Sequence, residues 1–239
     1  MAKYIINPLR LSRNITNPIR FFMDECVPPI IRDSKFFMYP FFYIWFKRHQ
    51  IRRYMEFKSR VYSMTNDEYE TVYRELDCIA KDRESDLNTK CRDYILSKLA
   101  PEAKTLLDVG CGSASFLKLA YRRGYAISGC DVLDEVRIKG GEYRKGNIES
   151  LPFEDAEFDI VTSIHTLEHI RDIHRAIAEL KRVAKRQLVI VVPCQRYYYY
   201  SLDLHIHFFP VKEQLQYLIG LPNSTCVKLW GDWVYIGQL

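Results

Sequence analysis

The chain has 239 residues, of which 48% are hydrophobic and 27% charged, so it can bury a full α/β core and is neither fibrous nor disordered. Its net charge is +5, but residues 1–62 hold 12 of the 35 Lys and Arg and only 4 of the 30 Asp and Glu. The local charge of +8 in this first quarter, against −3 for the remainder, indicates an anionic partner, either nucleic acid or an acidic membrane surface.

The seven cysteines are widely spaced and form no CxxC pair, which predicts neither a disulfide framework nor a zinc site and favours a reducing cytoplasm. The first 22 residues lack the continuous apolar core of a secretory signal. No stretch approaches the roughly 20 apolar residues that are needed to cross a bilayer.

Three parts follow one another along the chain, with no internal repeat. Residues 1–65 form a basic, aromatic arm in which prolines break any long helix, and eight of the eleven residues in FFMYPFFYIWF, at 36–46, are aromatic. Residues 66–103 form a helical cap that Asn66 or Asp67 can begin. Residues 104–239 form the third part.

Strands and helices alternate in this third part. We expect buried strands at 105–110, 125–131, 158–164 and 187–193, and helices at 115–124 and 172–185, the second with Ile173, Ile177, Leu180 and Ala184 on one face. Two strands around a Gly-Asp turn close the sequence. The alternation predicts an α/β fold with a doubly wound, mostly parallel sheet.

The first of these strands ends in a glycine-rich turn, Leu-Asp-Val-Gly-Cys-Gly-Ser at 107–113, that opens a helix. Glycine lets the backbone turn sharply and lets a ligand approach closely. By itself the turn fits a dinucleotide site almost as well, which keeps an NAD-dependent oxidoreductase as a rival. Asp108 can face a cationic group, and Asp131, at the end of the next strand, can accept from both ribose hydroxyls. Together they indicate a nucleoside ligand whose other end is a zwitterion.

Four segments in order, LLDVGCGSASFLKLA, ISGCD, GNIESLPFEDAEFDIVTSIHTLEHI and ELKRVAKRQLVIVVP, resemble the class I S-adenosylmethionine-dependent methyltransferases. The resemblance implies a Rossmann-like sheet of seven strands whose last strand, WVYIGQ, is antiparallel, and it implies S-adenosylmethionine as cofactor. It places the methionine moiety at Asp108, Gly110, Cys111 and Gly112, the ribose at Asp131 and Val132, the adenine at Asn147 and Ile148, and the sulfonium and substrate mouth at Ser163 and His165. Asn147 departs from the usual aspartate, and it also fits an ordinary turn.

An oxygen acceptor needs a base in addition to the cofactor. His205 and His207 alternate with Ile206 after the 187–193 strand, so both can face one side, and we expect His205, His207 or His165 to be catalytic. Each also fits a structural role, as we expect for Glu168 and His169. Only two possible ligands lie close in this segment, so we expect no metal site.

The aromatic arm suits a membrane surface, with Trp and Tyr at the headgroup level and Lys35, Lys47 and Arg48 facing anionic lipid. A packing or dimerisation arm is the alternative. The block VPPIIRDSKFFMYPFFYIWFK resembles an N-terminal extension of methyltransferases associated with bacterial surface polysaccharide and glycolipid assembly. This resemblance implies O-methylation of a sugar hydroxyl on a lipid-linked or surface glycan.

Two other functions remain open, a methyltransferase of isoprenoid quinones or other lipids and an inactive methyltransferase fold that acts as a membrane adaptor. We expect a cytoplasmic protein, peripheral on the inner face of the cytoplasmic membrane. No compact RNA-binding motif occurs, so we expect no nucleic-acid partner.

Overall fold

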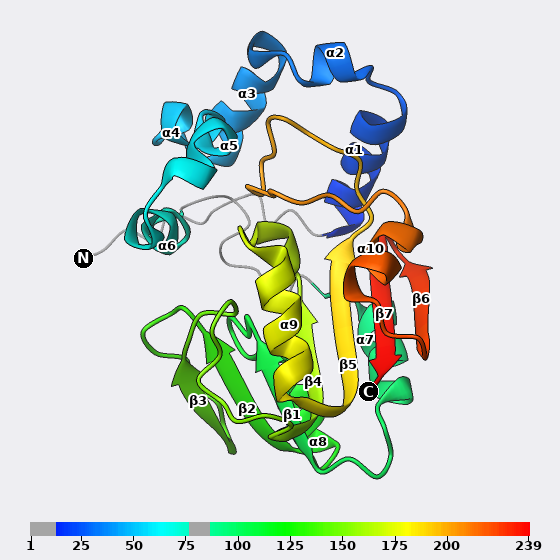
Figure 1. The fold of residues 1–239 in the computed structure, drawn as a ribbon. Coiled ribbons are helices and arrows are strands. Elements are labelled where there is room, and N and C mark those ends of the chain that lie inside the picture. Colours follow the sequence, from blue (N-terminus) through cyan, green and yellow to red (C-terminus); the bar gives the residue numbers. More distant parts are fainter. Residues whose placement is uncertain (1–12, 77–86) are drawn as a thin grey trace, which may run out of the picture. The chain divides into compact units, whose positions relative to one another are not determined.

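The computed structural model describes residues 13–76 and 87–239, which divide into two compact units (Figure 1). The first unit is Met1–Arg83 with Tyr198–Leu204, and the second is Glu84–Tyr197 with His205–Leu239. The cap expected at residues 66–103 stays a prediction. Its helix Asn66–Arg74 belongs to the first unit and its helix Thr89–Lys98 to the second.

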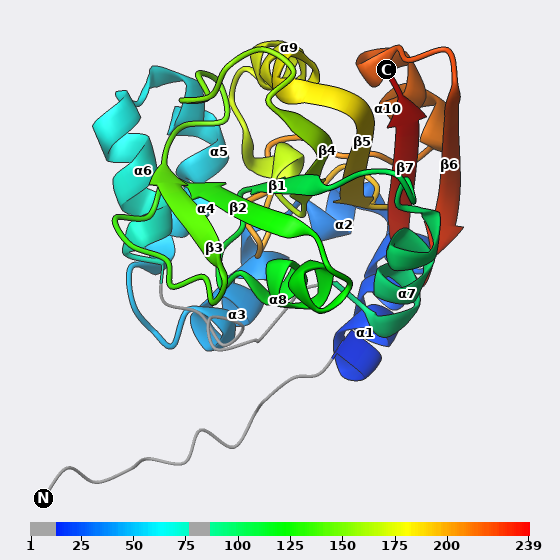
Figure 2. The ribbon, with the colours of Figure 1, turned by 90° about the horizontal axis from the view of Figure 1, so that it is seen from below.

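The second unit is built on one seven-stranded sheet in the order β3-β2-β1-β4-β5-β7-β6 (Figure 2). The strands are β1 (Thr105–Val109), β2 (Ala126–Asp131), β3 (Gly141–Lys145), β4 (Phe158–Ile164), β5 (Ala184–Pro193), β6 (Ser224–Leu229) and β7 (Asp232–Gln238). Strands β1 to β5 are parallel, and β7 is antiparallel to both of its neighbours. This confirms the predicted doubly wound sheet with an antiparallel last strand.

Helices cover both faces of this sheet, α9 and α10 on one and α7 and α8 on the other (Figure 2). Their bounds are α7 (Thr89–Lys98), α8 (Ser115–Arg122), α9 (Ile173–Val183) and α10 (Lys212–Ile219), and a short 3₁₀ helix, η2 (Leu167–His169), follows β4. Ile177 and Leu180 of α9 pack in the core against β1, β4 and β5. The helix is shorter than predicted, because Ala184 pairs with Phe158 and thereby begins β5.

One edge of the sheet collects the residues that matter for function. Parallel strands β1, β2, β4 and β5 end there, and antiparallel β7 begins there, with its first residue Asp232 paired to Pro193, the last residue of β5. The turn before β7 is formed by Trp230 and Gly231, both with positive φ, and not by Gly231 and Asp232 as expected.

The first unit is helical. It contains α1 (Arg13–Glu25), α2 (Pro29–Arg32), α3 (Lys35–Trp45), α4 (Ile51–Met55), α5 (Phe57–Arg60), η1 (Val61–Ser63) and α6 (Asn66–Arg74). Helix α3 continues through Pro40, which was expected to break it, and buries Met38 and Phe42 one turn apart; Phe46, directly after the helix, is also buried. Thr65 begins α6 with a reciprocal capping box to Glu68, in place of the expected cap at Asn66 or Asp67.

The segment Tyr198–Leu204 is held inside the first unit by contacts with its helices. The Lys58 ammonium donates to the Tyr198 carbonyl, and the Tyr73 hydroxyl donates to the Leu204 carbonyl at 3.2 Å. Phe42 of α3 meets the Tyr200 ring edge-on at 6.3 Å. Among the described residues, no helix is long and apolar enough to cross a bilayer.

Candidate functional site

Asp108 sits one residue before the end of β1 and is only 3% exposed. Its Oδ1 accepts a 2.6 Å hydrogen bond from the hydroxyl of Thr162 on β4, which is its register partner in the sheet. Burial raises the pKa of Asp108 to about 7, against the lowering effect of the Thr162 hydrogen bond. A cationic ligand group at this carboxylate would restore its ionised form, as the ammonium of a methionine moiety would.

The turn after β1 needs glycine for two different reasons. Gly110 has φ +75°, and a Cβ there would lie 2.2 Å from Thr166 Oγ1, so both backbone and packing exclude a side chain. Gly112 has φ +47°, but its Cβ would meet no heavy atom of the described residues within 4 Å. The space beside Gly112 is therefore open to a ligand, as expected for a cofactor cradle.

Asp131 closes β2 and ties the glycine turn to the loop that follows. Its Oδ2 accepts from the Gly112 backbone N–H at 2.8 Å, and its Oδ1 accepts from Leu133 N–H at 3.3 Å. A carboxylate has about four acceptor sites, so two remain for hydroxyl groups. The next residue, Val132, is 37% exposed.

The predicted adenine residues occupy a tight turn after β3. Asn147 Oδ1 accepts from the Glu149 N–H at 2.8 Å, and the Asn147 carbonyl accepts from the Ser150 N–H at 2.9 Å. Ile148 is 5% exposed and belongs to the core beneath α9. The Asn147 amide oxygen thus already serves the turn, so its role toward adenine stays a prediction.

Two further predicted cofactor residues are buried. Cys111 is 7% exposed, and burial together with the nearby Asp108 and Asp131 raises the pKa of its thiol well above the usual range, which keeps it neutral. Ser163, on β4, is fully buried, and its hydroxyl has no hydrogen-bond partner in the described part of the chain. A polar group left unpaired in this way is available to a ligand.

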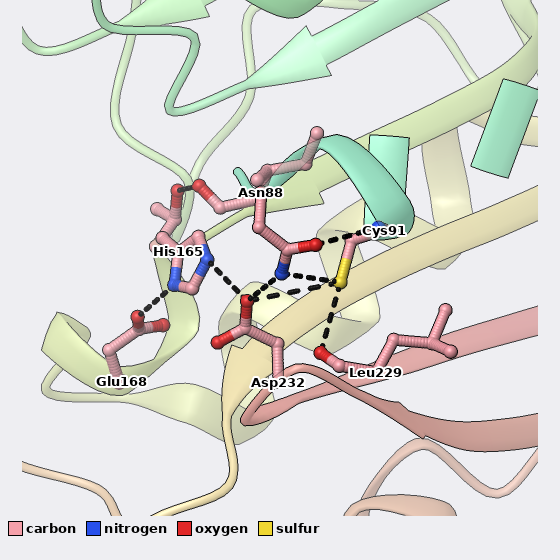
Figure 3. Close-up of polar contacts among 8 residues, drawn as sticks. Asn88, Cys91, His165, Glu168, Leu229 and Asp232 are labelled. Carbon is pink, nitrogen blue, oxygen red and sulfur yellow. Dashed lines mark hydrogen bonds and ion pairs between the residues drawn. The ribbon is translucent and has the colours of Figure 1, made fainter. Parts of the chain in front are cut away.

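His165 lies between two buried carboxylates just after β4 (Figure 3). Its Nδ1 is 3.3 Å from Oε1 of Glu168, and its Nε2 is 3.6 Å from Oδ2 of Asp232, which also accepts from the Asn88 amide at 3.1 Å. Both ring nitrogens of His165 thus face carboxylate oxygens, an arrangement that orients the ring. Its catalytic role stays a prediction.

Glu168 keeps its charge despite being 1% exposed. Burial acts to raise the pKa of Glu168, but the hydrogen bond from His165 and the charges of His165, His169 and His205 outweigh it and hold the value below the ordinary one. The spacing of His165 and Glu168, one helical turn apart, was a signal for this pair. Asp232 and Asn88 come from distant strands and helices and had no such signal.

The two predicted bases contact different partners. His205 is buried, with Nδ1 2.9 Å from Oε1 of Gln195. His207 is partly exposed, and its Nε2 lies 2.7 Å from the Ile170 carbonyl. Since a carbonyl only accepts, Nε2 of His207 carries the proton, and the lone pair of the neutral ring is on Nδ1. Of the two, His207 has the protonation pattern and exposure that a base needs.

Residues 107–192 match a protein family described as a methyltransferase domain. The chain therefore contains a class I S-adenosylmethionine-dependent methyltransferase domain. The matched residues of this methyltransferase domain include Asp108, the glycine turn and Asp131. Its cofactor is S-adenosylmethionine.

Similar proteins agree with this assignment. Over 111 residues the chain is 37% identical to a ubiquinone biosynthesis O-methyltransferase of Hahella chejuensis, covering 42% of this chain and 47% of that protein. It is 29% identical over 115 residues to a demethylmenaquinone methyltransferase of Thermotoga maritima, covering 44% and 50%. This chain thus spans about half the length of these relatives. A crystal structure of a methyltransferase from Aquifex aeolicus shares the fold, with a TM-score of 0.51, 17% identity, and coverage of 62% of this chain and 88% of that one.

Proposed function

We propose that the protein transfers a methyl group from S-adenosylmethionine to a hydroxyl of a lipid-linked acceptor at a membrane surface. The observation that carries the membrane part is the apolar exposure of α1 to α3. Phe36 is 92% exposed, Ile30 85% and Ile44 61%. Large apolar side chains that are exposed on neighbouring helices such as α2 and α3 are typical of contact with a partner or a membrane.

Helix α3 is apolar on two sides. Met38, Phe42 and Phe46 face the core of the first unit, whereas Phe36 and Ile44 face outward. A helix that is hydrophobic all round usually has apolar material on both sides. The exposed Lys35 and Arg48 on and beside α3 add positive charge that favours anionic lipid. These features support a peripheral position on the inner face of the cytoplasmic membrane.

The chemistry is an in-line displacement in which the acceptor oxygen attacks the methyl carbon. The new C–O bond forms as the S–CH₃ bond breaks, the sulfonium becomes a thioether, and the hydroxyl proton leaves. His207 is our proposed proton acceptor, because the lone pair of its neutral ring lies on Nδ1. Asp108, Gly112 and Asp131 hold the cofactor.

A sugar hydroxyl is the acceptor that we propose. Tyr197, at the edge where β5 ends, is 52% exposed and meets Phe208 edge-on at 5.2 Å, which leaves ring surface for a sugar face. An isoprenoid quinone is the second candidate, and it is favoured by the two relatives, which are named as ubiquinone and menaquinone methyltransferases. Both acceptors are membrane-held, so the arm suits either.

Transfer of a labelled methyl group tests the proposal directly. The protein is incubated with labelled S-adenosylmethionine and anionic vesicles that carry either a polyprenyl-linked glycan or a demethylated quinone. Label in the glycan supports the first acceptor, and label in the quinone selects the second. Cofactor binding without transfer to any lipid-soluble or glycan acceptor would favour the inactive adaptor.

Co-sedimentation with anionic vesicles tests the arm. The variant Phe36→Ser/Ile44→Ser should lose most vesicle binding, while Tyr217→Ser, an equally exposed aromatic on α10 at 86%, should keep it. Equal sedimentation of both variants would contradict a membrane role for α3 and return it to packing or dimerisation.

A further inference from the structure

Three possible metal ligands meet at the edge where β4 and β5 end. Glu168 and His169 belong to η2, after β4, and His205 follows β5. One ligand atom from each lies within 4.8 Å of the other two. The sequence did not signal this group, because its members are separated by 36 residues and only the fold unites them.

One carboxylate oxygen of Glu168 has no hydrogen-bond partner within residues 13–76 and 87–239. Its Oε1 is engaged by His165 at 3.3 Å, while its Oε2 is buried and has no hydrogen-bond partner in the described part of the chain. Leaving a charged oxygen unpaired in the interior costs more than a typical hydrogen bond returns. A cation at Oε2 would remove this cost.

His205 is oriented as a metal ligand would be. Its Nδ1 faces Oε1 of Gln195 at 2.9 Å, and that oxygen only accepts, so in the neutral ring the proton lies on Nδ1 and the lone pair on Nε2. Histidines that bind metals almost always donate their other ring N–H to a carbonyl or carboxylate in this manner. The ring of His169 packs against that of His205, with centroids 4.9 Å apart.

The backbone holds the two halves of the group together. The N–H groups of Ile206 and His207 both donate to the Glu168 carbonyl, at 2.8 and 3.0 Å. The His207 ring bonds the Ile170 carbonyl. These contacts fix the segment that carries His205 beside η2, so the backbone that carries the ligands is held in place before a metal arrives.

We propose that Glu168, His169 and His205 bind one divalent transition-metal ion. Two imidazoles and one carboxylate suit zinc, cobalt, manganese or iron rather than calcium or magnesium, which prefer oxygen alone. Bonds of about 2.1 Å separate tetrahedral ligand atoms by about 3.4 Å, so small side-chain rotations close the site. Three protein ligands leave a position open.

The open position gives the ion a role that rests on the proposed function. An acceptor hydroxyl bound there would lose its proton more readily, because the metal stabilises the oxyanion. In this arrangement His205 is a metal ligand and not the base, and the proton passes to His207. The site thus selects for an oxygen acceptor, in preference to a carbon acceptor.

Binding of Co²⁺ to the metal-free full-length protein tests the site without cofactor or acceptor. We expect one ion per chain with ligand-field bands typical of nitrogen and oxygen ligands. Glu168→Gln and His205→Gln should weaken binding by more than about tenfold, and Gln195→Leu by about tenfold. His174→Gln, which alters an exposed histidine on α9, should bind as the wild type does.

Absence of binding to the wild type would overturn the proposal, as would binding that Glu168→Gln and His205→Gln leave unchanged. A sulfur-to-cobalt charge-transfer band would also overturn it, since it would place the ion on a cysteine. The wild-type spectrum decides the matter if a variant fails to fold. A thermal shift with S-adenosylhomocysteine is measured in parallel, so that failure of the metal site and failure of the methyltransferase function are distinguished.

Discussion

Thr162 donates a 2.6 Å hydrogen bond to Asp108, its register partner on the neighbouring strand of the sheet. The bond fixes one oxygen of the Asp108 carboxylate. Within the described residues, no cationic side chain forms a hydrogen bond or a salt bridge with this carboxylate. The site therefore carries a buried acid whose pKa desolvation raises to about 7. Binding of an ammonium group at this carboxylate would consequently be linked to the ionisation of Asp108.

The Asp108→Asn variant should bind S-adenosylhomocysteine about 10 to 100 times more weakly, because a charged hydrogen bond contributes about 1.5–3 kcal/mol. The fold should persist, since the amide oxygen still accepts from Thr162. Calorimetry measures the change. Asp155→Asn, at a side chain that is 82% exposed, serves as control. Unchanged affinity in Asp108→Asn would place the amino group of the cofactor elsewhere.

The pH dependence of unfolding should carry the signature of the same acid. The ordinary pKa of an aspartate is 3.8, and that of Asp108 in the ligand-free fold is about 7. Between these values the folded state holds a proton that the unfolded state has released. The contribution of this group to stability is therefore full below pH 4 and falls until about pH 7.

Urea unfolding from pH 4 to pH 8 measures this contribution as a difference between two proteins. The free energy of unfolding of Asp108→Asn minus that of the wild type should increase across the window, by roughly 4 kcal/mol at most. Affinity for S-adenosylhomocysteine should rise over the same interval in the wild type. A difference that stays flat with pH would show that Asp108 is ionised throughout.

Alanine at the two glycines should separate stability from cofactor binding. Gly110→Ala should lower the free energy of unfolding by about 2–5 kcal/mol, because alanine would be strained in the left-handed backbone and would overlap Thr166. Gly112→Ala should lower the free energy of unfolding by only about 1–2 kcal/mol. Its affinity for S-adenosylhomocysteine should fall markedly, because the methyl group enters the open space. Gly124→Ala, with φ +91° and open surroundings beyond α8, controls for backbone strain alone. Equal affinity in Gly112→Ala and Gly124→Ala would contradict the cradle.

Replacing His165 by Gln should destabilise the second unit by about 3 kcal/mol, because Glu168 and Asp232 lose the imidazole that lies between them. Adding Asp232→Asn should recover part of the loss, since it removes one buried charge. Urea denaturation measures both variants. Full stability together with lost turnover in His165→Gln would instead support the catalytic role predicted from the sequence.

The meeting of the residues predicted to hold the cofactor could be foreseen, because they lie near one another along the chain. Asp108, Gly110 and Gly112 share one strand and its turn, and Asp131 ends the next strand, so the edge rule for parallel sheets brings them together. The same rule predicted that the segment after β5 lies near them. Neither step required knowledge of side-chain packing.

Other features depend on contacts that a sequence does not display. The edge strand β3, with the mostly exposed sequence GEYRK, shows no apolar alternation, so only the family resemblance implied a strand before Asn147, and α10 was not predicted. Helix α9 is shorter than predicted because Ala184 pairs with Phe158. Helix α3 continues past Pro40, and the aromatic side chains of Phe42 and Phe46 that follow the proline are buried. The acid that faces Nε2 of His165 comes from β7, 67 residues away.

Because β7 is antiparallel to β5, the hairpin before β7 determines which side chain this strand places at the functional edge. Parallel strands can deliver only their final residues to that edge, whereas β7 delivers its first, Asp232, directly after Trp230 and Gly231. Because side chains alternate between the faces of a strand, a slip of β7 by one residue against β5 would turn this carboxylate to the opposite face. The length of a two-residue turn thus decides whether the edge holds an acid beside His165.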